Sequence, residues 1–329
     1  MLRYMIRRIL QAIPTVIGVT MLSFLIISAA PGDPIQLMTF GPNYTAEDRE
    51  RLAEKFCLDR GPVEQYFVWM IGDVRKGVCE GKGILRGDFG VSLYSRQPVS
   101  EIIAAGVRPT LELTTGAMVF GVIIGVFIGV LSALRHGTWF DNLSRFFSVI
   151  FDAVPQFWMG LILIMVLSVQ FGVLPVGGRV PLNDDNITLL DRARHLVMPS
   201  FVLAVSWIAL MSRFMRAETL EVISKEYVRT ARAKGLPERQ VNYVHAARNA
   251  LIPIATFMGP AIVGLVGGAV VIERVFSWPG IGRITVDAVN ARDYPIVMGG
   301  VILGAVIVIL GNLLTDFFLV LVDPRIRFD

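Results

Sequence analysis

The sequence predicts an all-α membrane protein with six transmembrane helices, cytoplasmic N and C termini, and a folded loop on the extracytoplasmic side. Of its 329 residues, 54% are hydrophobic and only 18% are charged, whereas soluble domains carry about 25% charged residues. The apolar residues gather in long runs, and the basic residues flank these runs instead of clustering with aromatic residues. The composition therefore argues against a soluble enzyme, a disordered chain and a nucleic-acid-binding protein.

Six windows of the sequence contain no Asp, Glu, Lys or Arg. A helix needs about 20 apolar residues to cross the hydrocarbon core of a bilayer, and all its backbone groups must be hydrogen-bonded within the segment. Five windows are long enough, and the fourth, with 18 residues, is the shortest. The windows are Ile9–Ala30, Leu113–Leu134, Ala153–Gly178, His195–Ser212, Asn249–Ile272 and Tyr294–Thr315.

The distribution of Lys and Arg sets the orientation of these helices. With the N-terminus inside, the inner segments hold 15 Lys and Arg residues, and the short outer loops hold 6. Cytoplasmic loops carry the excess of positive charge, and long loops translocate regardless of their charge. We therefore expect a first helix in residues 1–30, an extracytoplasmic loop subdomain over 31–108, and a core of five helices over 109–329 with a cytoplasmic loop at 213–250.

Both cysteines of the chain, Cys57 and Cys79, lie in the long outer loop. An oxidising exterior permits a disulfide between them. The alternative is two buried free thiols.

The 213–250 loop has the pattern of a helix, a turn and a second helix. We expect the first helix over Thr219–Lys234, with Gly235 in the left-handed position that ends it and Pro237 in the first turn of the next helix. By itself, this pattern also fits a charged loop that binds no partner.

Small residues recur every four positions in the second window, where Gly121, Gly125 and Gly129 lie between Ala117 and Ala133. Such a row lets two membrane helices approach closely. The contact is either an interface that slides during function or static packing. Shorter rows occur at 264–268 and 300–304.

The sequence offers no catalytic centre and no cofactor site. Its three histidines are far apart in sequence and lack metal-ligand spacing. It contains no phosphate-binding Gly-rich loop that ends in Lys-Ser or Lys-Thr and no Gly-x-Ser-x-Gly nucleophile elbow. We therefore expect no enzyme activity, no metal and no bound cofactor in this chain, and an energy source on another subunit.

Several motifs show a resemblance to a known family. Residues Glu226–Leu236, followed by Arg248–Pro253, resemble the cytoplasmic EAA loop of ABC importer permeases. More narrowly, the chain resembles the B-type permease subunit of the dipeptide/oligopeptide/nickel ABC importer family. The stretches that carry this resemblance are Ala30–Pro34, Gly87–Ser92, Arg108–Leu113, Pro155–Trp158, Glu273–Gly282 and Arg292–Pro295.

The resemblance implies a type I permease fold in the plasma (inner) membrane of a bacterium or archaeon. It implies that the chain pairs with a homologous C-type permease in the lipid bilayer to form the path for peptides or a related solute. Two ABC ATPase subunits would bind ATP and Mg, and an extracytoplasmic binding protein would deliver the solute. The alternative is a polytopic membrane enzyme or receptor that uses the outer loop.

The resemblance also assigns a role to the EAA loop, as the coupling helix that enters a groove of the ATPase. The general family pattern has Glu-Ala-Ala where this chain has Arg229, Thr230 and Ala231, so contacts are not transferable position by position. Small side chains would allow close entry, and basic side chains would pair with acidic groups of the groove. The residues assigned to coupling are Glu226, Arg229, Thr230, Ala231, Arg232, Ala233, Lys234, Gly235 and Leu236.

The segment after the fifth window is expected to form a re-entrant or interfacial turn on the outer side. It would close the path there or contact the binding protein, and the alternative is an aromatic anchor at the membrane interface. Its assigned residues are Glu273, Phe276, Trp278, Pro279, Gly280 and Gly282. The stretch around Lys76–Ile84, which contains Cys79, looks like an addition to the family's outer loop, so the resemblance implies a Cys57–Cys79 bridge that is specific to a subset of the family.

Overall fold

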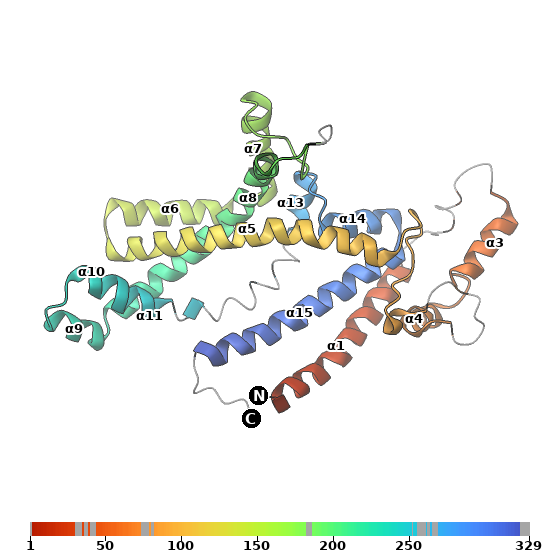
Figure 1. Ribbon diagram of the computed structural model, residues 1–329, viewed down its shortest axis with the longest axis horizontal. Coiled ribbons are helices and arrows are strands. Elements are labelled where there is room, and N and C mark those ends of the chain that lie inside the picture. The colour runs from red at the N-terminus through yellow and green to blue at the C-terminus, as the bar shows by residue number, and fades with distance from the viewer. Residues whose placement is uncertain are drawn as a thin grey trace. The chain divides into compact units, whose positions relative to one another are not determined.

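A computed structural model describes residues 2–29, 35, 39, 44–73, 79, 82–181, 186–251, 253–254, 261, 264 and 269–322 (Figure 1). In these residues the chain is helical, apart from one isolated antiparallel bridge between Val91 and Pro98. The chain forms two compact units, which we describe separately. The first contains residues 1–108 and 280–310, and the second contains 109–279 and 311–329.

Four helices among the described residues are long and apolar enough to cross a membrane, and four of the six predicted windows coincide with them, apart from Ala30, which lies outside the described residues. The fifth predicted window, Asn249–Ile272, lies largely outside the described residues. The four helices are α1 (Leu2–Ala29), α5 (Val99–Leu134), α8 (Leu189–Ile223) and α15 (Tyr294–Val322).

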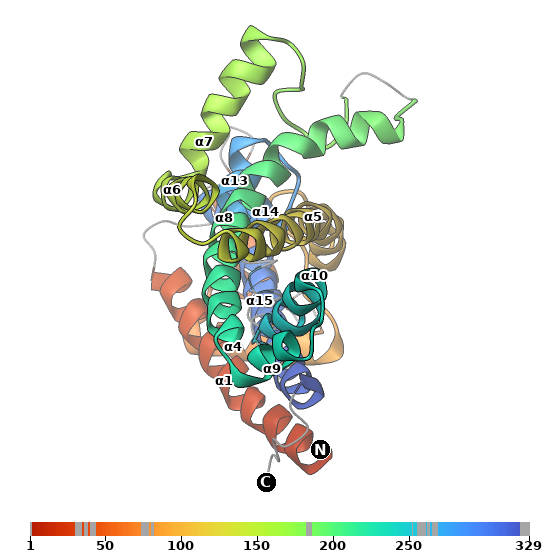
Figure 2. The same cartoon turned by 90° about the vertical axis from the view of Figure 1, so that its left-hand side faces the viewer.

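The third predicted window is part of a longer, bent element. Helix α6 (Trp139–Ala153) is followed by α7 (Gln156–Leu163), which continues as the π-helix η2 (Ile164–Gln170), and the two parts bend by 98° at a short break (Figure 2). Helix α6 therefore lies almost entirely outside the charge-free windows. Asp141, Arg145 and Asp152 interrupt the charge-free pattern in α6. The two aspartates each accept a hydrogen bond from an arginine of α8.

The first unit joins the outer loop to parts of the chain far away in sequence. The loop contributes α3 (Ala46–Lys55), α4 (Pro62–Ile71) and the short 3₁₀ helix η1 (Ile84–Arg86), and the C-terminal part contributes α14 (Ile281–Ala291). Phe24 of α1, Tyr66 of α4 and Met298 of α15 form one buried cluster. The described part of the outer loop therefore packs against α1 and α15 through this cluster, and its standing as a subdomain of its own stays a prediction.

The second unit contains the remaining helices, and two of its buried clusters join the segments discussed below. One joins α5, α8 and α13 (Val270–Val275) through Leu113, Val202 and Ile272. The other packs the end of α8 against the segment that follows it, through Met211 and Met215.

Candidate functional site

The segment predicted to couple to an ATPase is a separate short helix. Helix α8 ends at Ile223, and α9 covers Glu226–Ala233, so the single helix expected over Thr219–Lys234 is broken. At the break, the Ser224 hydroxyl donates a hydrogen bond to the Glu221 carbonyl oxygen at 2.6 Å. This local bond competes with continuation of the helix.

Gly235 ends α9 as predicted, with a φ of +74°. Pro237 then precedes α10 (Glu238–Gln240), which continues into the π-helix η3 (Val241–Ala247) and α11 (Arg248–Ala250). A Cβ atom built on Gly235 would meet no atom within 4 Å. Glycine is therefore required here for its backbone conformation and not for lack of space within this chain.

The two faces of α9 have different surroundings. Val228 and Ala231 are 0% and 7% exposed and pack in the cluster that contains Met211 and Met215 of α8. Ala231 therefore contacts this chain's own helices, and its assignment to the ATPase groove stays a prediction. The other assigned positions of the segment are exposed, except Leu236, which is half-buried; the exposed ones are Glu226, Arg229, Thr230, Arg232, Ala233, Lys234 and Gly235.

Three basic side chains in and next to the segment already have acidic partners within this chain. Arg229 Nη1 lies 2.9 Å from Glu226 Oε1, and Arg232 Nε lies 3.1 Å from Glu238 Oε1. The hydrogen bond from Lys225 to Glu221 raises the pKa of Lys225. Exposed ion pairs contribute only about 0–1 kcal/mol, so these side chains can exchange their present partners for acidic groups of another protein at small cost.

The aromatic residues of the Glu273–Gly282 segment are buried. Phe276 and Trp278 are each 1% exposed, and Glu273 is 0% exposed. Trp278 Nε1 donates to the Pro109 carbonyl oxygen at 2.9 Å, and Thr110 Oγ1 donates to Glu273 Oε1 at 2.6 Å. The segment therefore meets the Arg108–Leu113 motif.

Both rings are therefore covered by this chain's own residues. The contact of the segment with a binding protein stays a prediction. Of the remaining assigned residues, Pro279 is exposed, Gly280 caps the start of α14, and Gly282 is buried in the first turn of that helix. A role of this segment in closing the path remains a prediction.

The loop before α8 packs on the same aromatic motif. The Gly178 amide donates to the Phe276 carbonyl oxygen at 2.8 Å, and His195 Nδ1 lies 3.0 Å from the Gly177 carbonyl oxygen. Arg179 makes two hydrogen bonds to Glu112, of 2.7 and 2.9 Å. Glu112 and Arg179 each border a charge-free window, and nothing in the sequence indicates that they pair.

In the first unit, two further motifs meet around a buried carboxylate. Asp293, which is 2% exposed, accepts hydrogen bonds from the Ser92 hydroxyl and from the amides of Leu93 and Tyr94, the latter two at 3.1 and 3.4 Å. Asp293 belongs to the Arg292–Pro295 motif and Ser92 to the Gly87–Ser92 motif. About 200 residues of sequence separate the two.

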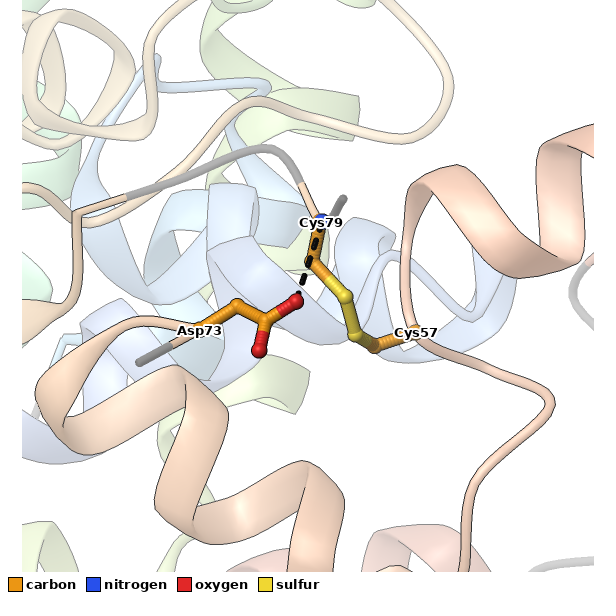
Figure 3. Close-up of side chains that lie close together, drawn as sticks. All are labelled: Cys57, Asp73 and Cys79. Atoms are coloured by element: carbon orange, nitrogen blue, oxygen red, sulfur yellow. Dashed lines mark hydrogen bonds between the residues drawn. A yellow bond between two sulfur atoms is a disulfide. The ribbon is translucent and has the colours of Figure 1, made fainter. Parts of the chain in front are cut away.

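Cys57 and Cys79 form a disulfide, with their Cα atoms 5.7 Å apart (Figure 3). Asp73 lies beside it and accepts a hydrogen bond from the Cys79 amide at 3.4 Å. Arg60 binds the same carboxylate at 3.1 Å, which raises the pKa of Arg60. The spacing of these sulfur and carboxylate groups would also suit a metal ion, but the two sulfurs are bonded to each other, so we interpret the cluster as a covalent link between α3 and the chain after α4.

The glycine row of α5 lies against α8. A Cβ atom built on Gly125 would lie 2.7 Å from Met211 Cβ, and one built on Gly129 would lie 2.6 Å from the Ser212 carbonyl oxygen. One on Gly121 would overlap Trp207. These distances are too short for any side chain larger than hydrogen, so the row fixes a close contact between the two helices.

Comparisons with known proteins agree with these motifs. The model of a family described as "Binding-protein-dependent transport system inner membrane component" matches residues 125–328, and the model of its N-terminal region matches 1–114. The chain is 42% identical to the oligopeptide transport system permease protein AppB of Bacillus subtilis, over all of both chains. It is 37% identical to the dipeptide transport system permease protein DppB of Escherichia coli K12, over 99% of both chains. It is 38% identical to the glutathione transport system permease protein GsiC of the same strain, over all of both chains.

Two solved structures share the fold. The inward-facing MetNI methionine ABC transporter matches with a TM-score of 0.52 and 21% identity, over 69% of this chain and 98% of the matched chain. An amino acid ABC transporter crystallised with histidines matches with a TM-score of 0.50 and 19% identity, over 69% and 95%.

Proposed function

The chain belongs to the family of inner-membrane components of binding-protein-dependent transport systems and is a permease subunit of an ABC importer, and we propose that its solute is a short peptide or peptide-like molecule. The names of three relatives that match nearly the whole chain support this solute class, because they refer to oligopeptides, a dipeptide and glutathione. The alternative of a membrane enzyme or receptor loses its support, since these relatives are transport permeases.

We further propose that the exposed face of α9 docks into an ATPase subunit. The support is the division of α9 into a buried face and an exposed face. Val228 and Ala231 attach α9 to α8, while Thr230, Ala233 and Lys234 face away from the core. A push on this face would reach α8 directly, because α9 has little freedom to move separately. ATP and Mg are expected on the ATPase subunits and not on this chain.

The expected assembly contains a second, homologous permease, two ATPase subunits and a binding protein, in the plasma membrane of a bacterium or archaeon. The test is to purify the tagged chain from a strain that expresses its neighbouring genes, and to measure ATP-dependent uptake of labelled trialanine into proteoliposomes. Co-purified ATPases and competition by unlabelled dipeptide and tripeptide are expected. Absence of ATPases from an active preparation would contradict the importer assignment, and ATP-dependent uptake of another solute class without peptide competition would contradict the solute class.

A variant tests the docking face more closely. Ala233→Trp adds bulk to the exposed face of α9, and Tyr227→Trp, at an exposed residue of the same helix, serves as a milder control. We expect Ala233→Trp to remain in the membrane while it loses ATPase co-purification. Full ATPase binding by this variant would show that the face is not the docking surface.

A further inference from the structure

Three helices of the second unit meet at a buried ion pair. The Asp141 side chain of α6 is 1% exposed and accepts two hydrogen bonds from Arg216 of α8, at 2.6 Å from Nε and 2.8 Å from Nη2. Ser132 of α5 donates to the same carboxylate at 2.6 Å, and the Gly137 amide donates at 3.0 Å. Both carboxylate oxygens therefore have two donors each, which is the condition under which a buried charge is tolerated.

This pair is one end of a polar seam between the bent element α6–α7 and α8. The Ser148 and Ser212 hydroxyls lie 2.9 Å apart, and Gln156 Nε2 donates to Ser206 Oγ at 2.8 Å. We call the three contacts Asp141–Arg216, Ser148–Ser212 and Gln156–Ser206 the polar seam. Residue numbers rise along α6–α7 from Asp141 to Gln156 while those of their partners fall along α8 from Arg216 to Ser206, so the two elements run antiparallel at these contacts. A shift of one helix by a single residue would break all three contacts in apolar surroundings, so the seam fixes the register of the two elements.

The elements joined by the seam extend to both candidate sites of this unit. Beyond Arg216, α8 packs against Val228 of α9 in one buried cluster. Beyond Gln156, α7 packs against α13, where a Cβ atom built on Gly160 would lie 3.1 Å from the Phe276 ring. The unit thus contains a continuous line of packed elements from the exposed α9 segment to the buried Glu273–Trp278 motif.

We propose that Asp141 and Arg216 are positioning residues for energy coupling, which lock α6–α7 to α8 so that movement of α9 displaces α7 and α13 together with α8. The proposal rests on the importer function, because it needs an ATPase that moves α9. Coupling of this kind requires elements that move between two arrangements as rigid bodies. A register fixed by a buried, fully hydrogen-bonded charge pair gives the elements that rigidity.

The test uses the complete importer in proteoliposomes, with ATP hydrolysis and uptake of labelled trialanine measured on the same assembled complexes. Asp141→Asn and Arg216→Gln are expected to lower uptake about tenfold while ATP hydrolysis changes far less, so that the number of ATP molecules hydrolysed per peptide rises. The charge-swapped double variant D141R/R216D is expected to recover part of the uptake. Recovery is partial because an arginine at 141 cannot accept the Ser132 and Gly137 hydrogen bonds.

A matched control lies on the same two helices. Asp152 and Arg213 form an ion pair at 2.9 Å, but their side chains are 52% and 40% exposed. Asp152→Asn is expected to change the ATP-to-peptide ratio by less than about twofold, since exposed pairs contribute little. A merely structural role of Asp141 would lower the amount of assembled complex and leave the ratio per complex unchanged, and that result would overturn the proposal.

A second experiment does not depend on the folding of charge variants. Ser148→Cys with Ser212→Cys places two thiols where hydroxyls now lie 2.9 Å apart. If the seam moves as one body, oxidation should join the thiols and leave ATP-driven uptake intact. Loss of uptake that is restored by reduction, or failure of the thiols to join, would overturn the proposal. In either experiment, a wild-type complex without ATP-driven peptide uptake would count against the proposed function. If the wild type and the variants instead hydrolyse the same number of ATP molecules per peptide, the result would count against the role of the seam alone.

Discussion

Gly235 offers a test in which backbone strain and contact with a partner can be separated. Its φ is +74°, and a Cβ atom there would meet nothing within 4 Å. A residue with a side chain costs about 1–2 kcal/mol in the left-handed conformation, and asparagine costs less because its side chain bonds locally. Because the surrounding space is open, this cost should not grow with side-chain size in the isolated subunit. Gly235→Ala and Gly235→Trp are therefore expected to destabilise the turn equally, and Gly235→Asn less.

In the assembled importer, the Gly235 variants should differ in ATP-driven uptake. If the turn after α9 faces an ATPase, Gly235→Ala should keep most of the uptake, because a loss of about 1 kcal/mol in the turn is opposed by the buried contacts of Val228. Gly235→Trp should abolish ATP-driven uptake, since the ring would occupy the partner's position. The readouts are ATPase retention on the tagged permease and labelled trialanine uptake per assembled complex.

The control is Gly172, which also has a positive φ, +62°, and also has no atom within 4 Å of a built Cβ. Gly172→Trp imposes the same strain outside the α9 segment and should leave ATPase retention unchanged. Equal uptake by Gly235→Ala and Gly235→Trp would refute the reasoning, because it would show that the turn faces no partner.

Two further predictions concern the first unit. The Cys57–Cys79 bridge closes a loop with a sequence separation of 22, for which the chain-entropy relation gives a stabilisation of about 3 kcal/mol. Replacing both cysteines by serine should therefore lower the hydrogen-exchange protection of α4 by about a hundredfold. Unchanged protection would contradict a stabilising bridge. Asp293→Asn removes acceptors from a buried site with three donors and should destabilise the unit by about 1–3 kcal/mol in thermal unfolding. Asp287→Asn, whose side chain is 52% exposed, is the matched control and should have little effect; equal effects of the two substitutions would refute the assignment.

The sequence predicted the elements whose signals are local. Charge-free windows located α1, α5, α8 and α15, and the Gly235-Leu-Pro237 stretch located the end of α9. The same criterion missed α6, because Asp141, Arg145 and Asp152 divide its sequence into short charge-free stretches. Asp141 is paired with Arg216, which is 75 residues away in sequence, and no local pattern contains that pairing.

The candidate sites show the same limit. The motif Glu273–Gly282 was identified from its residues, but its burial against Pro109 and Thr110 depends on a contact between segments more than 160 residues apart. A tryptophan beside a proline and glycines fits both an interfacial anchor and a buried hydrogen-bonded ring. Only the position of the Pro109 carbonyl oxygen decides between them. Likewise, α9 has one buried face and one exposed face because α8 ends at Ile223 and α9 packs back against it.

The glycine row and the buried ion pair depend on each other, which gives a last prediction. A Cβ atom on Gly129 would lie 2.6 Å from the Ser212 carbonyl oxygen and 3.1 Å from the Arg216 amide nitrogen. Close approach of α5 therefore occurs at the turn of α8 that carries Arg216, and this approach lets Ser132 reach Asp141. Gly129→Ala should push α5 away and weaken that hydrogen bond. Ser132→Ala should then cost about 1–3 kcal/mol in the wild type but less in the Gly129→Ala background.

Thermal unfolding of the four combinations in detergent measures this dependence as a coupling free energy, expected to be about 1 kcal/mol. Gly116→Ala is the control, because a Cβ atom there would lie 3.9 Å from Ser200 Oγ, an ordinary contact distance. It should leave the cost of Ser132→Ala unchanged. Strict additivity of Gly129→Ala and Ser132→Ala would mean that α5 keeps its place despite the added methyl group. The turn at Gly137 alone would then position Ser132 next to the Asp141 carboxylate, and the glycine row would not stabilise the ion pair.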